Sequence, residues 1–227
     1  MKYRNIKEGI FVSRPNRFIA FVIVDGITQK CHVKNTGRCK ELLVPGVTVY
    51  LEEALNQNRS TRYSLIAVQK GAHLINMDSQ APNKVVHEWL LEGNLSEEYA
   101  RIKPEQVYGN SRFDFYMESH ERKAYMEVKG VTLEEEGSVF FPDAPTERGV
   151  KHIHELCKCL KDGYDAYIMF VIQMENVKCF KPNDRTHKEF GDALREAEKQ
   201  GVKIMAMNCM VTADSLKLKE SVPVILN

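Results

Sequence analysis

The chain has 227 residues, of which 43% are hydrophobic and 28% charged, proportions that are ordinary for a soluble globular protein of one large or two small domains. Its net charge of +1 hides an asymmetry, since residues 1–80 carry a balance of +6 and residues 81–227 a balance of −5. No cleavable signal is evident, and the apolar run Phe18 to Val24 is too short to span a membrane. The six cysteines form no CxxC pair, and a chain of this size does not need a disulfide framework. We therefore expect a cytoplasmic protein with reduced thiols and no membrane partner.

Residues 9–76 are rich in β-strand signals. The segments 18–24 and 27–33 flank Asp25-Gly26, a strong two-residue hairpin signal, and further strands are predicted at 47–51 and 62–69. Four to five strands without a long helix indicate a small barrel or sandwich. A partly open Greek-key barrel of the oligonucleotide-binding (OB) type is our prediction for residues 1–80.

The pattern changes near Pro82, which suits the first turn of a helix that stops at Gly93. Strands are predicted at about 101–107, 111–118 and 123–129, followed by a helix at 146–161 and a buried strand at 165–173. A capping box, Thr186 to Glu189, predicts the start of a helix that Gly201 closes, and a strand follows at 202–207. The order αβββαβαβ predicts a mixed α/β domain over residues 81–227.

The segments 111–118 and 123–129 alternate polar and apolar residues and are predicted to form one hairpin. If the turn is centred between His120 and Glu121, Asp114 lies opposite Glu127, with Cβ atoms roughly 4.5–5.5 Å apart. Two carboxylates this close repel each other, and a bound divalent cation would offset the repulsion. The alternation also predicts that Arg112 and Lys129 share the polar face, so an exposed cluster of ion pairs is the alternative interpretation.

The residue types suit phosphodiester hydrolysis. Mg²⁺, or Mn²⁺ in its place, suits one or two carboxylates, and it lowers the pKa of a bound water while it clamps a phosphate. We predict Asp114 and Glu127 as metal ligands and Lys129 as the group that contacts the phosphate or the attacking water. Glu88, from the preceding helix, is a candidate third carboxylate, and a solvated helix residue is its alternative.

The helix at 146–161 adds candidate phosphate contacts. Arg148, Lys151 and His152 lie in its first turns, and Arg148 and His152, four residues apart, face the same way. These groups could bind the DNA backbone or simply form the polar side of an amphipathic helix.

Basic residues also gather in the first part of the chain. A basic groove with aromatic platforms is how OB barrels hold nucleic acid, and Phe18 and Phe21 are interleaved with the basic residues here. In the alternative interpretation both rings are core and the charges are solvated. The predicted contacts are Arg14, Arg17, Lys34, Asn35 and Arg38.

An ordered set of short segments spans nearly the whole chain: Arg14-Pro-Asn-Arg-Phe18, Asn35-Thr-Gly37, Ser111-Arg-Phe-Asp114, Glu127-Val-Lys-Gly-Val-Thr-Leu133, Phe141-Pro-Asp-Ala144 and Thr146-Glu-Arg-Gly-Val-Lys-His152. This set resembles the sugar fermentation stimulation protein A (SfsA) family. The resemblance implies an N-terminal OB barrel, a C-terminal restriction-endonuclease-like domain of the PD-(D/E)xK type, and Asp114, Glu127 and Lys129 as its triad. It also implies DNA binding and a link to maltose metabolism. The Pro of the PD motif is absent before Asp114.

Two functions follow. The first is a Mg²⁺- or Mn²⁺-dependent endo- or exodeoxyribonuclease, and the second is a non-catalytic DNA-binding regulator of sugar metabolism on the same scaffold. In both we expect DNA, single- or double-stranded and without strong sequence specificity, as the partner, and a homo-oligomer is compatible with either.

Overall fold

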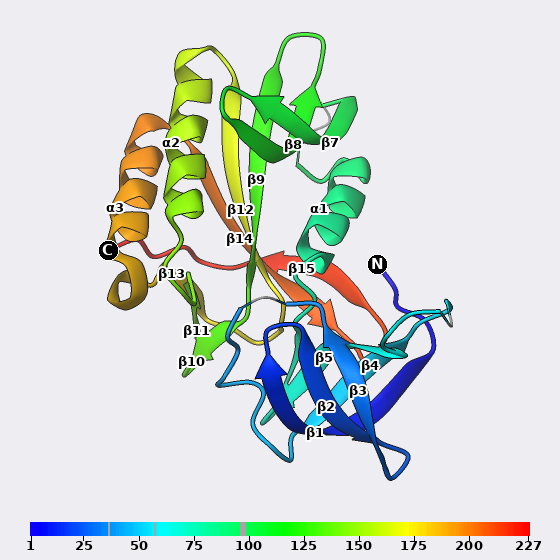
Figure 1. Cartoon of the computed structure of the whole chain (residues 1–227). Helices are drawn as coiled ribbons and strands as arrows, with labels where there is room; N and C mark the ends of the chain where they lie inside the picture. The colour runs from blue at the N-terminus through cyan, green and yellow to red at the C-terminus, as the bar shows by residue number, and fades with distance from the viewer. Residues whose placement is uncertain (36, 57, 96–98) are drawn as a thin grey trace.

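The computed structural model describes residues 1–35, 37–56, 58–95 and 99–227. It places a β-barrel built from the N-terminal residues below a larger α/β part (Figure 1). None of the helices among these residues is long and apolar enough to cross a membrane.

The N-terminal barrel has five strands in a closed ring, and a short sixth strand extends it. Neighbours follow the order β3-β2-β1-β4-β5-β6, and a β3–β5 pairing closes the ring. The predicted OB barrel is confirmed, and so is the Asp25-Gly26 hairpin, in which both turn residues have positive φ and Val24 pairs with Ile27. The strands are β1 (Ile6–Asn16), β2 (Ile19–Val24), β3 (Ile27–Val33), β4 (Thr48–Glu53), β5 (Tyr63–Lys70) and β6 (His73–Asn76).

The larger part is a mixed sheet with the order β15-β14-β12-β9-β8-β7. The predicted order of helices and strands from Pro82 is confirmed, with additional short strands that the sequence did not signal. The main elements are α1 (Ala81–Leu91), β7 (Arg101–Tyr108), β8 (Ser111–Glu118), β9 (Lys123–Val131), α2 (Glu147–Lys161), β12 (Asp165–Ile172), α3 (Asp184–Gln200), β14 (Lys203–Val211) and β15 (Leu216–Ser221). A small sheet joins β10 (Leu133–Glu135), β11 (Ser138–Phe141) and β13 (Cys179–Pro182).

Helices cover both faces of the larger sheet (Figure 1). On one face α1 packs Val85 and Leu90 against a cluster that includes Met126. On the other face α2 and α3 pack Leu156 and Phe190 into a second cluster. The parallel strands β9, β12 and β14 lie between these layers, which is why the run through β12 is apolar at nearly every position.

The predicted capping box at Thr186 is wrong. The helix begins at Asp184 after Asn183, and the backbone at His187 leaves the helical region, with φ −155° and ψ 88°. The Nδ1 atom of His187 accepts a hydrogen bond from the Thr146 amide, so a tertiary contact occupies this turn in place of a local cap. The predicted stop is confirmed, because Gly201 adopts the left-handed conformation with φ 105°.

A buried polar network joins the barrel to the larger sheet. The Gln173 amide, at the end of β12, donates from Nε2 to Asn76 Oδ1 at 2.9 Å and to the Asp78 carbonyl at 3.1 Å. Asn76 in turn donates to the Tyr3 hydroxyl. Because these groups are buried and mutually hydrogen-bonded, the network fixes how the barrel meets the sheet.

Candidate active site

The hairpin of β8 and β9 forms in the predicted register. Phe115 pairs with Met126 and Glu118 with Lys123. This is the pairing expected for a turn centred between His120 and Glu121. The backbone pairing of β8 with β9 ends at Phe115. At the next residue of β8 a side chain accepts the strand's hydrogen bond instead: Asp114 Oδ2 accepts from the backbone N–H of Val128 at 2.7 Å. Asp114 is thereby tied to the residue that follows Glu127.

Asp114 is held from a second side by the start of α1. Asn83 Nδ2 donates to Asp114 Oδ1 at 2.6 Å. Burial, followed by the neighbouring Glu127 carboxylate, raises the pKa of Asp114, although the two donated hydrogen bonds oppose the rise. Asn83 was missed by the sequence analysis, and no feature of its surroundings in the sequence distinguishes it.

Glu127 lies in the middle of β9, with 3% of its surface exposed. Its Oε1 accepts hydrogen bonds from Lys129 Nζ, at 2.6 Å, and from His152 Nδ1. Its Oε2 is buried and has no hydrogen-bond partner among the described residues. Burial alone would raise the pKa of Glu127, but the His152 hydrogen bond and the Lys129 ammonium together lower it.

A relay of hydrogen bonds extends from Glu127 along α2. Arg148 Nε donates to His152 Nε2 at 3.4 Å, and since a guanidinium has no acceptor, Nε2 is the acceptor of the imidazole. The other ring nitrogen, Nδ1, then carries the proton and donates it to Glu127 Oε1. Both residues lie on one face of α2, four positions apart, as the sequence indicates.

Two of the residues predicted on α2 have different surroundings from those expected. His152 is only 5% exposed and supports Glu127, so it is not free to contact a DNA backbone, which corrects that prediction. Lys151 is exposed and donates to the Asn110 carbonyl at 2.7 Å, next to the β7–β8 turn. Arg148 is exposed at the start of the helix.

Glu88 does not join the site. It lies farther along α1, where its Oε2 pairs with the N-terminal ammonium of Met1 at 2.6 Å. Asn83 occupies the position on α1 that faces Asp114, and positions five apart on a helix point in clearly different directions. The prediction of Glu88 as a third metal ligand is therefore wrong.

Arg112 does not converge on the carboxylates either. The strict alternation predicted for β8 breaks at Asp114: Phe113 packs edge-on against His152, whereas Phe115 stacks on His87 of α1. Opposite Asp114 on β7, Glu105 has φ 53°, outside the β region. Arg112 is left exposed, 3.6 Å from Glu105.

Three of the five predicted contacts on the barrel serve the fold. Arg14 donates to four backbone carbonyls, those of Arg17, Asn35, Gly37 and Arg38. Asn35 uses its amide to accept from the Gly37 N–H and to donate to the Met77 carbonyl. Lys34 pairs with Glu52 at 2.9 Å and with Asp78 at 3.4 Å. Internal partners bind most polar atoms of these three side chains, although Arg14 Nε has no hydrogen-bond partner among the described residues. These contacts give the three residues a structural role, and their contact with DNA stays a prediction.

Arg17 and Arg38 remain exposed on the barrel. They line a groove of about 450 Å³ together with Lys40 and apolar residues of β1. The Arg17 guanidinium lies 4.7 Å from the centre of the Phe18 ring, which is 46% exposed. Phe18 is thus a surface ring and not the core residue of the alternative interpretation.

The donor set of Asp114 and Glu127 fits a hard divalent cation. Glu127 offers the buried Oε2 without a partner, and each Asp114 oxygen keeps an acceptor site beyond its one hydrogen bond. No cluster of three or more His, Cys, Asp or Glu side chains that could hold a metal occurs among the described residues. A site with two carboxylates suits Mg²⁺, which keeps several of its waters.

Comparison with known proteins identifies relatives over the whole chain. Residues 12–77 match the family model described as the SfsA N-terminal OB domain, and residues 80–215 match the sugar fermentation stimulation protein RE domain. A sugar fermentation stimulation protein homolog from Clostridium beijerinckii is 59% identical over 226 residues, which cover 100% of both chains. A homolog from Desulfitobacterium hafniense is 60% identical over 224 residues, 99% of this chain and 98% of the relative. The solved structure of Pyrococcus furiosus SfsA in complex with Ca²⁺ superposes with a TM-score of 0.88 at 29% identity, covering 99% and 98% of the two chains.

Proposed function

The chain belongs to the sugar fermentation stimulation protein family, and on this basis we propose that it binds DNA and hydrolyses phosphodiester bonds with Mg²⁺ or Mn²⁺. In this proposal the larger domain is restriction-endonuclease-like and carries the reaction, and the OB barrel helps to hold the strand.

The observation that carries the proposal is the buried Glu127 Oε2. A buried carboxylate oxygen without a donor is costly, on the order of 1–3 kcal/mol, and this one lies next to a second carboxylate, Asp114. A divalent cation held by both carboxylates would remove that cost and the repulsion between them. The relative from Pyrococcus furiosus, whose structure is described as a Ca²⁺ complex, supports a divalent cation in this family.

When bound, the cation would stabilise negative charge on the phosphate and lower the pKa of a water at the site. The chain's own residues perform the remaining tasks. Asn83 and the Val128 N–H hold Asp114, while His152 and Lys129 both bind Glu127 Oε1 and so leave Oε2 for the cation. The Lys129 ammonium, 17% exposed, would contact a phosphate oxygen or orient the attacking water.

DNA binding rests on exposed basic groups of both domains. Arg17 and Arg38 line the groove of the barrel, and Arg148 and Lys151 lie exposed on the first turns of α2. Phosphate contacts of this kind fix the position of a strand without reading its sequence, which agrees with a protein of low sequence specificity.

The alternative is a non-catalytic DNA-binding regulator of sugar metabolism, maltose metabolism included. One observation favours it: groups of the protein itself already donate hydrogen bonds to three of the four carboxylate oxygens of the site. Both oxygens of Asp114 accept hydrogen bonds, and Glu127 Oε1 accepts two. Carboxylates that the protein's own hydrogen bonds hold in place can serve as part of a scaffold alone.

The test is cleavage of single- and double-stranded DNA in Mg²⁺ or Mn²⁺ by the full chain. Lys129→Ala and Asp114→Ala should lower the rate on the order of 10²-fold or more. Lys123→Ala, at the exposed start of the same strand, is the matched control and should keep the wild-type rate. Equal cleavage by the wild type and the two site variants would mean a contaminating nuclease and would refute the proposal. DNA binding without cleavage in either metal would select the regulator.

A further inference from the structure

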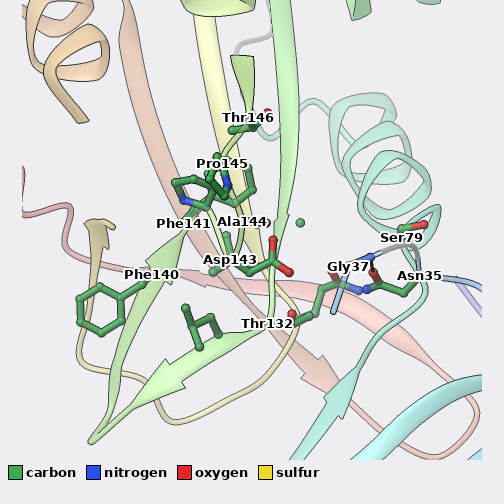
Figure 2. Close-up of a pocket in the computed structure, with 15 residues that line it drawn as sticks. Asn35, Gly37, Ser79, Thr132, Phe140, Phe141, Asp143, Ala144, Pro145 and Thr146 are labelled. Carbon is green, nitrogen blue, oxygen red and sulfur yellow. Dashed lines mark hydrogen bonds between the residues drawn. The ribbon is translucent and has the colours of Figure 1, made fainter. Parts of the chain in front are cut away.

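A polar cavity of about 340 Å³ lies where the barrel meets the larger sheet (Figure 2). Asn35, Gly37 and Ser79 line it from the barrel side, and the loop that leads from β11 into α2 lines it from the other side. Its size is near the lower end of the range of small-molecule sites, roughly 300–1,000 Å³. It is separate from the basic groove on the barrel, with which it shares only Gly37 among the described lining residues.

The cavity lies at the carboxyl ends of two neighbouring parallel strands. Residues 130–133 border it at the end of β9, and Gln173 borders it directly after β12. Crevices at the carboxyl ends of parallel strands are where open α/β sheets bind their ligands. Gly130 directly follows Lys129, so the cavity begins about 3.3 Å along the strand from the proposed phosphate site.

The floor of the cavity is polar and fixed. Gln173 is 2% exposed, and its Nε2 is held by Asn76 and by the Asp78 carbonyl, so the orientation of its amide is set. Its Oε1 lies against Gly130, where an added Cβ would come within 2.5 Å of it. Glycine at position 130 therefore leaves this oxygen uncovered by a side chain from β9.

The charge of the lining decides which ligand fits. None of its fifteen described residues is lysine or arginine, and Asp143 is the one charged side chain among them. Figure 2 shows the Asp143 carboxylate pointing from its loop toward Gly37, and an added Cβ on Gly37 would lie 2.8 Å from Asp143 Oδ2. A carboxylate without a basic neighbour in the lining repels a phosphate and accepts N–H donors.

The walls suit a flat, partly apolar molecule. Phe141, Pro142 and Leu133 contribute apolar surface, and the Phe141 ring is fixed by contacts with Phe170 and Phe190. Thr132 and Ser79 add hydroxyl groups. A planar ring with N–H donors on one edge matches this combination of apolar walls, fixed amide and single carboxylate.

We propose that this cavity binds one unpaired nucleobase, with preference for guanine, from the DNA strand whose phosphate lies at Asp114, Glu127 and Lys129. Guanine offers two adjacent N–H donors, N1–H and the exocyclic amino group, to the two oxygens of Asp143. A base can enter such a cavity only when it is unstacked, at a strand end or flipped out of a duplex. The assignment rests on the proposed function for the identity of the strand, and it narrows the substrate to DNA with an unpaired nucleotide.

The experiment is calorimetric titration of the metal-free full chain with 2′-deoxyguanosine, which carries no phosphate, and with thymidine, which lacks the exocyclic amino group. The wild type should bind deoxyguanosine saturably and at least tenfold more tightly than thymidine. Asp143→Asn should weaken deoxyguanosine binding on the order of tenfold, and Thr132→Phe should abolish it by filling the cavity. Asp25→Asn, which removes the same charge from the distant β2–β3 turn, is the control and should bind as the wild type does.

The folded state of each variant is checked by circular dichroism and by its melting temperature. No saturable binding of deoxyguanosine to the folded wild type would overturn the assignment, as would binding that a folded Thr132→Phe variant retains. The outcome is separate from that of the proposed function. Lys129→Ala should lower the cleavage rate on the order of 10²-fold or more and keep nucleoside binding. If only the assignment of the cavity is wrong, Thr132→Phe should cleave DNA at the wild-type rate.

Discussion

His152 and Glu127 meet in a buried hydrogen bond between the imidazole Nδ1 and the carboxylate Oε1, which joins the first half of α2 to the centre of β9. Lys129 Nζ binds the same oxygen. One oxygen of Glu127 thus has two donors and the other has none among the described residues. This asymmetry orients the carboxylate, because rotating it would break two hydrogen bonds to a buried anion.

His152→Ala should destabilise the protein. The substitution removes one of the two donors to a buried carboxylate, and a hydrogen bond to a charged group is worth about 1.5–3 kcal/mol. Urea denaturation monitored by circular dichroism measures the change in the free energy of unfolding. His154→Ala, at an exposed position two residues along the same helix, should change that free energy by less than about 0.5 kcal/mol. An equal loss in both variants would contradict a structural role for the bond to Glu127.

The two carboxylates should make opposite contributions to stability as the pH changes. The pKa of Glu127 is lowered below 4.5, so its contribution is present above that pH and is lost as the pH falls through its folded-state pKa. The pKa of Asp114 is raised above 3.8, so its contribution is present below that pH and is lost as the pH rises through its folded-state pKa.

Unfolding free energies of the wild type, Glu127→Gln and Asp114→Asn between pH 3 and 7 would test this. The advantage of the wild type over Glu127→Gln should shrink with acidification below about pH 4.5. Asp114→Asn should gain on the wild type as the pH rises above about 3.8. Parallel curves for all three proteins would contradict the opposite shifts.

The hairpin shows how much of the site the sequence could predict. Period-2 alternation and a short turn predict the β8–β9 pairing, and the register from Phe115 to Glu118 is confirmed. The same alternation predicts Arg112 on the polar face and is wrong there. The break at Asp114 depends on the Asn83 and Val128 hydrogen bonds and on the positive φ of Glu105 across the ladder, which are tertiary features.

Helix α1 shows the other limit. Its apolar spacing predicts the helix, but the rotation of a helix about its axis relative to a sheet is set by packing on both sides. Asn83 faces Asp114, and Glu88 faces the N-terminus, although a carboxylate is the more obvious ligand from composition. Composition likewise cannot distinguish Arg14, which organises a loop, from Arg17, which is exposed.

Mg²⁺ should raise the melting temperature of the wild type. Binding to the folded state alone stabilises it by about 2.7 kcal/mol when the free ion is at a hundredfold excess over its dissociation constant. Asp114→Asn should abolish the shift while the metal-free variant remains folded, because the Asn83 amide can rotate to accept a hydrogen bond from the new amide. Differential scanning fluorimetry with and without Mg²⁺ measures both effects. A shift of equal size in the variant would place the cation elsewhere.

Arg14→Ala should destabilise the barrel and not merely weaken DNA binding. The guanidinium donates to four carbonyls around the loop that includes Asn35 and Gly37, and the loss leaves these acceptors without their charged donor. A loss of roughly 2–3 kcal/mol in the free energy of unfolding is expected. Hydrogen exchange of the backbone amides of Asn35 and of residues 37–39 should also accelerate. A variant as stable as the wild type would show that solvent replaces the guanidinium at no cost.

Arg17→Ala tests the exposed neighbour of that arginine on the same barrel. Arg17 has no carboxylate partner among the described residues, and its side chain lies over the exposed Phe18 ring at the edge of the basic groove. If Arg17 contacts one phosphate, the variant should bind a single-stranded DNA more weakly. The negative slope of log K against log salt should become shallower by about 0.7, because one fewer phosphate is neutralised. Fluorescence anisotropy over a series of salt concentrations measures the slope. Arg62→Ala removes an exposed arginine that is paired with Glu53 elsewhere on the barrel, and it should leave the slope unchanged. A loss of affinity without a change in slope would mean that Arg17 acts through Phe18 stacking and not through a phosphate.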